Sequence, residues 1–271
     1  MKKIIKKYIL FLNVIYKMFT DEHNFMENLF QNINISKFKL PQTTFKYKLI
    51  ITGSIGVGKS TICEMLARCL NKISIDTNTQ IICYPEYIAS DSTYANKQIQ
   101  KRLNNEITAF EFQQYILDCW EYLLKQNQKY IKEDKNVICI YERTPEDSVC
   151  CFAYMDHVNK VLNTTELQEL SNRCYKLLSE YNIPSVCSST LFETRLFNNF
   201  DTCLIHLLMA IINEIQMDIL EGNESRIILI QSDPLTSMER IKRRNRKGEE
   251  IYSYSTINDL HNRYKQWFSY K

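Results

Sequence analysis

Two hydrophobic patterns alternate along the chain from about residue 45 onwards. Short, almost unbroken apolar runs lie between longer stretches in which apolar residues recur at helical spacing. The first pattern is typical of strands buried on both faces of a sheet, and the second is typical of amphipathic helices. The candidate strands are residues 47–52, 80–84, 137–141 and 226–231. The candidate helices are residues 62–70, 108–125, 167–181 and 198–220.

This alternation predicts an α/β fold, in which a parallel sheet of four to five strands is covered by helices on both faces. The 271 residues suit one domain of this class, residues 45–271, preceded by an extension at residues 1–44. Ligands of such sheets bind beyond the carboxyl ends of the strands. The residues that directly follow each strand are therefore the first candidates for chemistry.

A glycine-rich loop follows the first candidate strand. Residues 53–60 read GSIGVGKS, which fits the phosphate-binding pattern G-x-x-x-x-G-K-[ST] between a strand and a helix. Its glycines let backbone N–H groups point at phosphate oxygens, and the helix that begins near Lys59 directs the positive end of its dipole there. A glycine turn that matches by chance is the alternative. The candidate triphosphate-binding residues are Gly53, Ser54, Ile55, Gly56, Val57, Gly58, Lys59, Ser60 and Thr61.

Charged residues follow the second and third candidate strands. Glu86, in the run Pro-Glu-Tyr, is a candidate base for the proton of an attacking hydroxyl group. Glu142 can hold Mg²⁺ directly or through water, and Arg143 can neutralise phosphoryl oxygens. The structural alternatives are a solvated acid for Glu86 and a surface ion pair for the other two residues.

A strongly basic segment follows the fourth candidate strand. The formal net charge of the chain is only +3, which is too close to balance to indicate a nucleic-acid partner. Residues 240–247 nevertheless contain six cations in eight positions. Like charges on one helix destabilise it unless an anion binds, and the arginine fork suits phosphate oxygens. A nucleic-acid or nuclear-import patch is the alternative, but the glycine-rich loop favours a lid that closes over ATP.

The cysteines and the first 44 residues say less about function than the motifs do. The ten cysteines lie mostly inside apolar runs and form no C-x-x-C pair, so we expect free thiols in a reducing compartment. Residues 1–20 have a basic start and an apolar middle, but Asn13 and Lys17 interrupt it, no cleavage site follows, and it is too polar to span a bilayer. We expect an appended helix on a cytoplasmic protein. A mitochondrial or membrane-surface targeting segment is the alternative.

The ordered set of motifs resembles the deoxynucleoside kinases, and most closely the herpesvirus-type thymidine kinases. The likeness covers about residues 48–268 and rests on GSIGVGKS, YPE, RLNNEITAFEFQQY, ERTPEDSVCCF and RRNRKGE, the last followed by a helix containing LHNRYKQWF. It implies a P-loop kinase fold with a basic lid, the use of ATP and Mg²⁺, and a deoxynucleoside substrate in nucleotide salvage for DNA synthesis. Relatives commonly form homodimers through helices, and the apolar face of residues 204–219 is either such a surface or core.

The resemblance also implies roles in phosphoryl transfer. Glu86 is similar to the base that activates the sugar 5′-hydroxyl, Arg143 to the arginine that contacts this hydroxyl and the moving phosphate, and Lys59 completes the catalytic set. Glu142 and Ser60 resemble the ligands of Mg²⁺. The lid arginines implied to hold the nucleotide and its phosphates are Arg240, Arg244 and Arg246.

For the nucleoside, the resemblance implies that Gln113 pairs with the base, while Ile116 and Phe152 press on its two faces. Ordinary core positions are the alternative for the last two residues. Deoxycytidine-preferring relatives carry an arginine and an aspartate where this chain has Trp120 and Ser148, so we expect a thymidine-type or broad pyrimidine preference. The residues implied to contact the sugar are Tyr94 and Glu249.

Two departures from the family pattern leave alternatives open. Tyr87 replaces a proline that usually follows the catalytic glutamate, and the chain stops at Lys271 where relatives continue into a further strand beside the adenine. A thymidylate or other nucleoside monophosphate kinase is one alternative, although the segment around Gln113 lacks the cations that an acceptor phosphate needs. A catalytically inactive nucleotide-binding relative is the other.

Overall fold

The computed structural model describes residues 44–74, 78–86, 92–131, 134–186, 190–195, 200–245, 249 and 252–269. The extension predicted for residues 1–44 lies outside the described residues except for Thr44, and so do Tyr87 and Arg246. The described residues belong to one compact unit, Leu40–Lys271.

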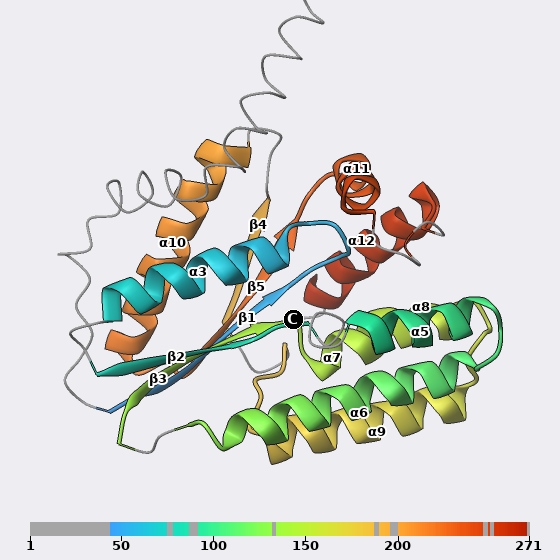
Figure 1. Ribbon diagram of the computed structural model, residues 1–271, viewed down its shortest axis with the longest axis horizontal. Coiled ribbons are helices and arrows are strands. Elements are labelled where there is room, and N and C mark those ends of the chain that lie inside the picture. The colour runs from blue at the N-terminus through green and yellow to red at the C-terminus, as the bar shows by residue number, and fades with distance from the viewer. Residues whose placement is uncertain are drawn as a thin grey trace, which may run out of the picture. The chain divides into compact units, whose positions relative to one another are not determined.

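Within the described residues, five parallel strands form one sheet in the order β2-β3-β1-β5-β4 (Figure 1). Their bounds are β1 (Lys46–Thr52), β2 (Thr79–Tyr84), β3 (Asn136–Glu142), β4 (Thr190–Arg195) and β5 (Ser225–Gln231). The four candidate strands are confirmed to within one residue at each end. Strand β4 was not predicted, because its sequence TLFETR has no unbroken apolar run. The predicted α/β class and parallel sheet are confirmed.

The long helices are α3 (Lys59–Ile73), α5 (Ser92–Leu103), α6 (Ala109–Gln128), α9 (Thr164–Glu180), α10 (Phe200–Glu221), α11 (Pro234–Arg244) and α12 (Tyr254–Ser269). Three short ones follow β3, namely α7 (Pro145–Asp147), the π-helical turn η3 (Ser148–Ala153) and α8 (Tyr154–Val158). Helix α6 begins at a capping box in which Thr108 and Glu111 satisfy each other's backbone N–H groups. Helix α5 was not predicted, because STYANKQIQKRL is polar almost throughout.

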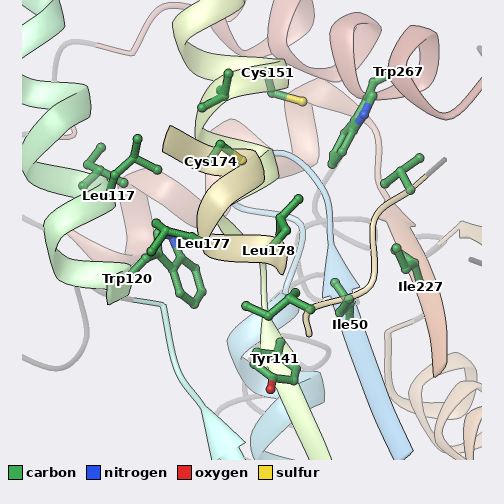
Figure 2. Close-up of a cluster of buried hydrophobic side chains, with 14 of the residues drawn as sticks. Ile50, Leu117, Trp120, Tyr141, Cys151, Cys174, Leu177, Leu178, Ile227 and Trp267 are labelled. Carbon is green, nitrogen blue, oxygen red and sulfur yellow. The ribbon is translucent and has the colours of Figure 1, made fainter. Parts of the chain in front are cut away.

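Helices cover both faces of the sheet, as predicted. On one face, Ile50, Tyr141 and Ile227 lie side by side on β1, β3 and β5 and point into a core shared with α6, α9 and α12 (Figure 2). On the other face, α3 packs against the strands and against α10 (Figure 1). Alternate residues of β1, β3 and β5 therefore meet different helices, which is why these three strands carry long apolar runs.

The apolar face of α10 is core rather than an exposed dimer surface. Leu204, Leu208, Ile211 and Ile215 are each at most 2% exposed. Of the eight cysteines whose side chains the structure describes, none is in a disulfide and five are buried, although Cys83 is exposed. Within the described part of the chain, no helix combines the length and apolar character needed to cross a membrane.

Candidate active site

The glycine-rich loop after β1 is pressed against β5 and α11. A Cβ atom on Gly53 would lie 2.3 Å from the carbonyl oxygen of Ile230, and one on Gly56 would lie 2.6 Å from that of Ser237. Gly58 has φ 99° and caps α3 without a side chain, so the first-turn N–H groups of α3 face the loop. Such a turn at a helix N-terminus is a cradle for phosphate oxygens.

Lys59 is the first residue of α3 and is buried in this loop. Its Nζ atom donates a hydrogen bond to the carbonyl oxygen of Ser54 at 2.8 Å. The pKa of Lys59 is lowered to about 8, mainly by burial and also by the neighbouring charge of Arg143, while Glu86 and Glu142 oppose this shift. Two cations in one buried place are stabilised by a polyanion, which is the charge that a triphosphate brings.

Glu142, the last residue of β3, reaches the start of α3. Its Oε1 atom accepts a hydrogen bond from the Ser60 hydroxyl at 2.6 Å, and the side chain is only 3% exposed. The two residues meet because β3 lies beside β1 in the sheet, with Ile51 opposite Glu142. Across the described residues no group of three or more histidine, cysteine or acidic side chains is placed to hold a metal. One carboxylate and one hydroxyl nevertheless suit Mg²⁺, which usually takes its remaining ligands from phosphates and water.

Glu86 and Arg143 are in direct contact. The Nη1 atom of Arg143 donates a hydrogen bond to Oε1 of Glu86 at 2.5 Å. Its Nη2 atom donates a hydrogen bond to the carbonyl oxygen of Gly53 at 3.2 Å. The backbone of Arg143 has φ 70°, an uncommon value that turns the chain out of β3. Burial disfavours its charge, but Glu86 raises the pKa of Arg143 well above the ordinary value. Its buried Nε atom has no acceptor among the described residues, so this N–H group is available to a ligand.

Asp147 supports this arrangement from behind. Its carboxylate accepts hydrogen bonds from the hydroxyls of Thr52 and Tyr264, the latter at 2.9 Å, and from the backbone N–H of Thr144 at 2.9 Å. It thereby joins β1, the turn after Arg143, and α12. Burial raises the pKa of Asp147, and the charge of Arg143 opposes this shift.

The residues expected around the base lie on α6 and on η3, which pack against each other. Gln113 is 3% exposed, and its Oε1 atom has no partner among the described residues. Phe152 lies under Arg143, whose guanidinium carbon is 5.0 Å from the ring centroid. Ile116 and Trp120 are buried in the core cluster, where Figure 2 shows Trp120 beside Leu177. Ser148, at the start of η3, is also buried.

Tyr94, which the resemblance implied to contact the sugar, is less enclosed. Half of its side chain is exposed, and its ring lies edge-on to Tyr115 with centroids 5.6 Å apart.

The lid residues are partly described. Arg240 donates to the carbonyl oxygen of Val57 at 3.2 Å, which ties α11 to the phosphate loop. Arg244 forms a two-pronged ion pair with Glu249, at 2.5 and 3.0 Å. The resemblance implied separate roles for these two residues, toward phosphate and toward sugar. Here they neutralise each other.

Three residues beside the site were missed by sequence reasoning. Asp147 had a signal, because Thr-Pro-Glu-Asp is a helix-capping pattern and the structure has this capping box. Asp156, which lies 3.9 Å from the guanidinium of Arg102, had none, because Arg102 is far away in the sequence. Tyr252 is half-buried beside the lid. The pKa of its hydroxyl is raised to about 12 by burial and by the charges of Glu249 and Glu86, while Arg143 opposes this shift.

Comparison with known proteins agrees with this geometry. The family model for deoxynucleoside kinases matches residues 49–187, which is just over half of the chain and includes the phosphate loop, Glu86, Gln113 and Arg143. A comparison with curated proteins found no match. Since the family model covers both the loop and the residues that converge on it, the chain belongs to the deoxynucleoside kinase family.

Proposed function

We propose that this kinase transfers the γ-phosphate of ATP to the 5′-hydroxyl of a pyrimidine deoxynucleoside, with thymidine preferred. The observation that carries the proposal is the 2.5 Å contact between Glu86 and Arg143 beside the phosphate loop. A carboxylate that can take a proton and a cation that can face a phosphoryl group are thereby held in one place. Phosphoryl transfer needs this combination at the acceptor oxygen.

The proposed reaction uses each described group in a defined way. Glu86 accepts the proton of the 5′-hydroxyl as the 5′-oxygen bonds to the γ-phosphorus. The bond between the γ-phosphorus and the β-phosphate oxygen breaks at the same time, and ADP leaves. Lys59, the loop N–H groups and Arg143 face the phosphate oxygens as their charge redistributes. Ser60 and Glu142 would hold Mg²⁺, which supplies charge neutralisation at the phosphates. Arg240, Arg244 and Arg246 belong to the lid that closes over the nucleotide.

The pyrimidine preference rests on the segment around Gln113. Its amide offers one donor and one acceptor, enough to pair with a pyrimidine edge. Trp120 and Ser148 carry no charge, whereas the deoxycytidine-preferring relatives have an ion pair at the matching positions. A buried aromatic ring at Trp120 also limits the space beside the base, which favours thymine with its methyl group over a larger purine.

A transfer assay tests the proposal. Purified protein is given ATP labelled in the γ-phosphate together with each of the four deoxynucleosides, or with thymidine monophosphate. We expect label in the nucleosides, most rapidly in thymidine, and little in the monophosphate. Label only in thymidine monophosphate would indicate a nucleoside monophosphate kinase, and binding of ATP without transfer to any acceptor would indicate an inactive relative.

A further inference from the structure

The segment that carries Phe152 has an uncommon backbone conformation. Residues Ser148–Ala153 form the π-helical turn η3, between the short helices α7 and α8. Such turns are wider than those of an α-helix, are usually limited to a single turn, and occur frequently at functional sites. Phe152 lies under the buried guanidinium of Arg143, whose central carbon is 5.0 Å from the ring centroid. The position of this ring therefore depends on the contacts that maintain η3.

Arg263 on α12 contacts this segment on both sides of Phe152. Its Nε atom donates a hydrogen bond to the backbone carbonyl oxygen of Cys150 at 2.6 Å. Its guanidinium also lies over the ring of Tyr154, with the central carbon 3.6 Å from the centroid. Cys150 comes two residues before Phe152, and Tyr154 comes two residues after it. A charged donor strengthens a hydrogen bond to a carbonyl, and a cation is attracted to the face of an aromatic ring.

Other side chains of α12 attach this helix to the same segment. Tyr264 donates to the carboxylate of Asp147, the residue directly before η3, at 2.9 Å. Trp267 of α12 and Cys151 of η3 belong to one hydrophobic core (Figure 2). Helix α12 therefore contacts the segment at its start through Tyr264, and in its middle and at its end through Arg263.

The phosphate loop is held by different contacts. Arg240 donates to the carbonyl oxygen of Val57 at 3.2 Å, and the loop glycines Gly53 and Gly56 are pressed against β5 and α11. A change at Arg263 should therefore affect the side of the site that carries Phe152 and leave the nucleotide side in place.

We propose that Arg263 is a positioning residue for the acceptor nucleoside, which maintains the π-helical turn so that Phe152 stays under Arg143 and faces the base. This inference deepens the proposed function and rests on it. Relaxation of η3 to an ordinary α-helix would turn its side chains about the helix axis, because the two helices differ in the number of residues per turn. Arg263 acts through η3 and does not itself touch the reacting atoms.

Steady-state kinetics with the full chain test the inference, using the deoxynucleoside that the transfer assay identifies as the best acceptor. Arg263→Met keeps an apolar stem but removes the donor to Cys150 and the cation over Tyr154. We expect the KM for the nucleoside to rise about tenfold, while kcat and the KM for ATP change less than about twofold. Arg263→Lys restores a cation and a donor, so its nucleoside KM should lie within about threefold of the wild-type value.

A double variant distinguishes positioning from general stabilisation. Phe152→Ala removes the ring through which Arg263 is proposed to act, and we expect its nucleoside KM to rise about tenfold. Adding Arg263→Met to Phe152→Ala should then raise this KM by less than about a further twofold. If Arg263 only stabilised the fold, the two effects would multiply, and that result would overturn the inference.

Lys265→Met is the matched control, because Lys265 is an exposed cation on the same helix. Its kcat and both KM values should match those of the wild-type protein. Thermal unfolding of each variant establishes whether it is folded. If Arg263→Met is not folded, Tyr154→Leu takes its place, since it removes the ring beneath the guanidinium, and we expect the nucleoside KM to rise about threefold.

The outcomes separate this inference from the proposed function. A wild-type protein that phosphorylates no deoxynucleoside overturns both. With an active wild-type protein, an unchanged nucleoside KM in folded Arg263→Met overturns the inference alone, and so does an equal rise in the KM values for nucleoside and ATP. The same holds for an unchanged nucleoside KM in Tyr154→Leu when that variant is the one used.

Discussion

Arg143 links the two halves of the candidate site. Its guanidinium contacts the Glu86 carboxylate, the carbonyl of Gly53 in the glycine-rich loop, and the ring of Phe152. The side chain is buried, and its left-handed backbone conformation is maintained by a hydrogen bond from its N–H to the carbonyl of Ile51. A lysine would not reproduce these contacts, because it lacks the planar fork.

Glu86→Gln tests the proton acceptor. Glutamine keeps the size of the side chain and its acceptor oxygen but does not take up a proton at neutral pH. We expect kcat to fall by about 10²-fold or more, while the KM values for nucleoside and ATP change little. Glu64→Gln is the matched control, since Glu64 is an exposed acid on α3 that pairs with Arg68. Near-normal kcat in Glu86→Gln would remove this residue from the role of base.

At the scale of elements, the site follows from the sheet. Strands β2, β3 and β1 are neighbours and run parallel, so Glu86, Glu142 and the phosphate loop leave the sheet at one edge. The apolar runs made these strands recognisable from the sequence, and the rule for ligand sites in parallel sheets placed the residues after them at this edge. Strand β4 and helix α5 lacked such runs and were missed.

Helices α11 and α12 meet beside the phosphate loop through a small polar cluster. The Ser237 hydroxyl lies 2.6 Å from that of Ser232 and 3.3 Å from Nε2 of His261. Burial lowers the pKa of His261 from 6.5 to about 4, and the charges of Lys265 and Lys59 lower it as well, while Asp233 raises it. His261 is therefore neutral at pH 7.

This shift predicts a pH dependence of stability. Between pH 6.5 and about 4 the unfolded chain binds the His261 proton more tightly than the folded protein does, so stability from this residue is complete above pH 6.5 and is lost as the pH falls toward 4. Thermal unfolding across this range should show a shallower decline in His261→Gln than in the wild-type protein. His206→Gln, at an exposed position on α10, should follow the wild-type curve. Parallel curves for His261→Gln and the wild-type protein would contradict the assignment.

At the scale of the whole molecule, one buried polar cluster joins elements that the sequence keeps far apart. Tyr47 on β1 donates to Asp218 on α10 at 2.6 Å, and Arg226 on β5 donates to both oxygens of the same carboxylate at 2.7 and 2.8 Å. Arg226 also pairs with Glu214. These contacts lie at the amino ends of the strands, opposite the candidate site.

Removal of the Asp218 carboxylate should therefore reduce global stability without changing the rate of phosphoryl transfer. Asp218→Ala leaves the Tyr47 hydroxyl and much of the Arg226 charge without their main acceptor, and we expect a loss of about 2–4 kcal/mol in urea unfolding. Arg68→Gln, which removes an exposed pair on α3, should cost less than about 0.5 kcal/mol. Equal free energies of unfolding for the two variants would show that the buried cluster stabilises the fold no more than an exposed ion pair does.

Much of the site was predictable because its parts are local. The phosphate loop is a contiguous motif, and Glu86 and Arg143 follow directly on apolar strands. The pairing of Arg244 with Glu249, the pairing of Asp156 with Arg102, and the network around Asp147 depend on segments packing together, and no local pattern encodes that. The burial of α10 was likewise left open by its sequence, since an apolar helix face suits core and interface equally well.

The central claim is that Glu86 and Arg143 converge on one sugar hydroxyl beneath the terminal phosphate of ATP. A crystal structure of the protein with thymidine and ADP tests this most directly. The account predicts that the 5′-oxygen lies within hydrogen-bond distance, about 2.6–3.2 Å, of both the Glu86 carboxylate and the Arg143 guanidinium, on the side that faces the phosphate loop. A complex in which the 5′-oxygen is bound elsewhere, or in which the two side chains face different cavities, would contradict it.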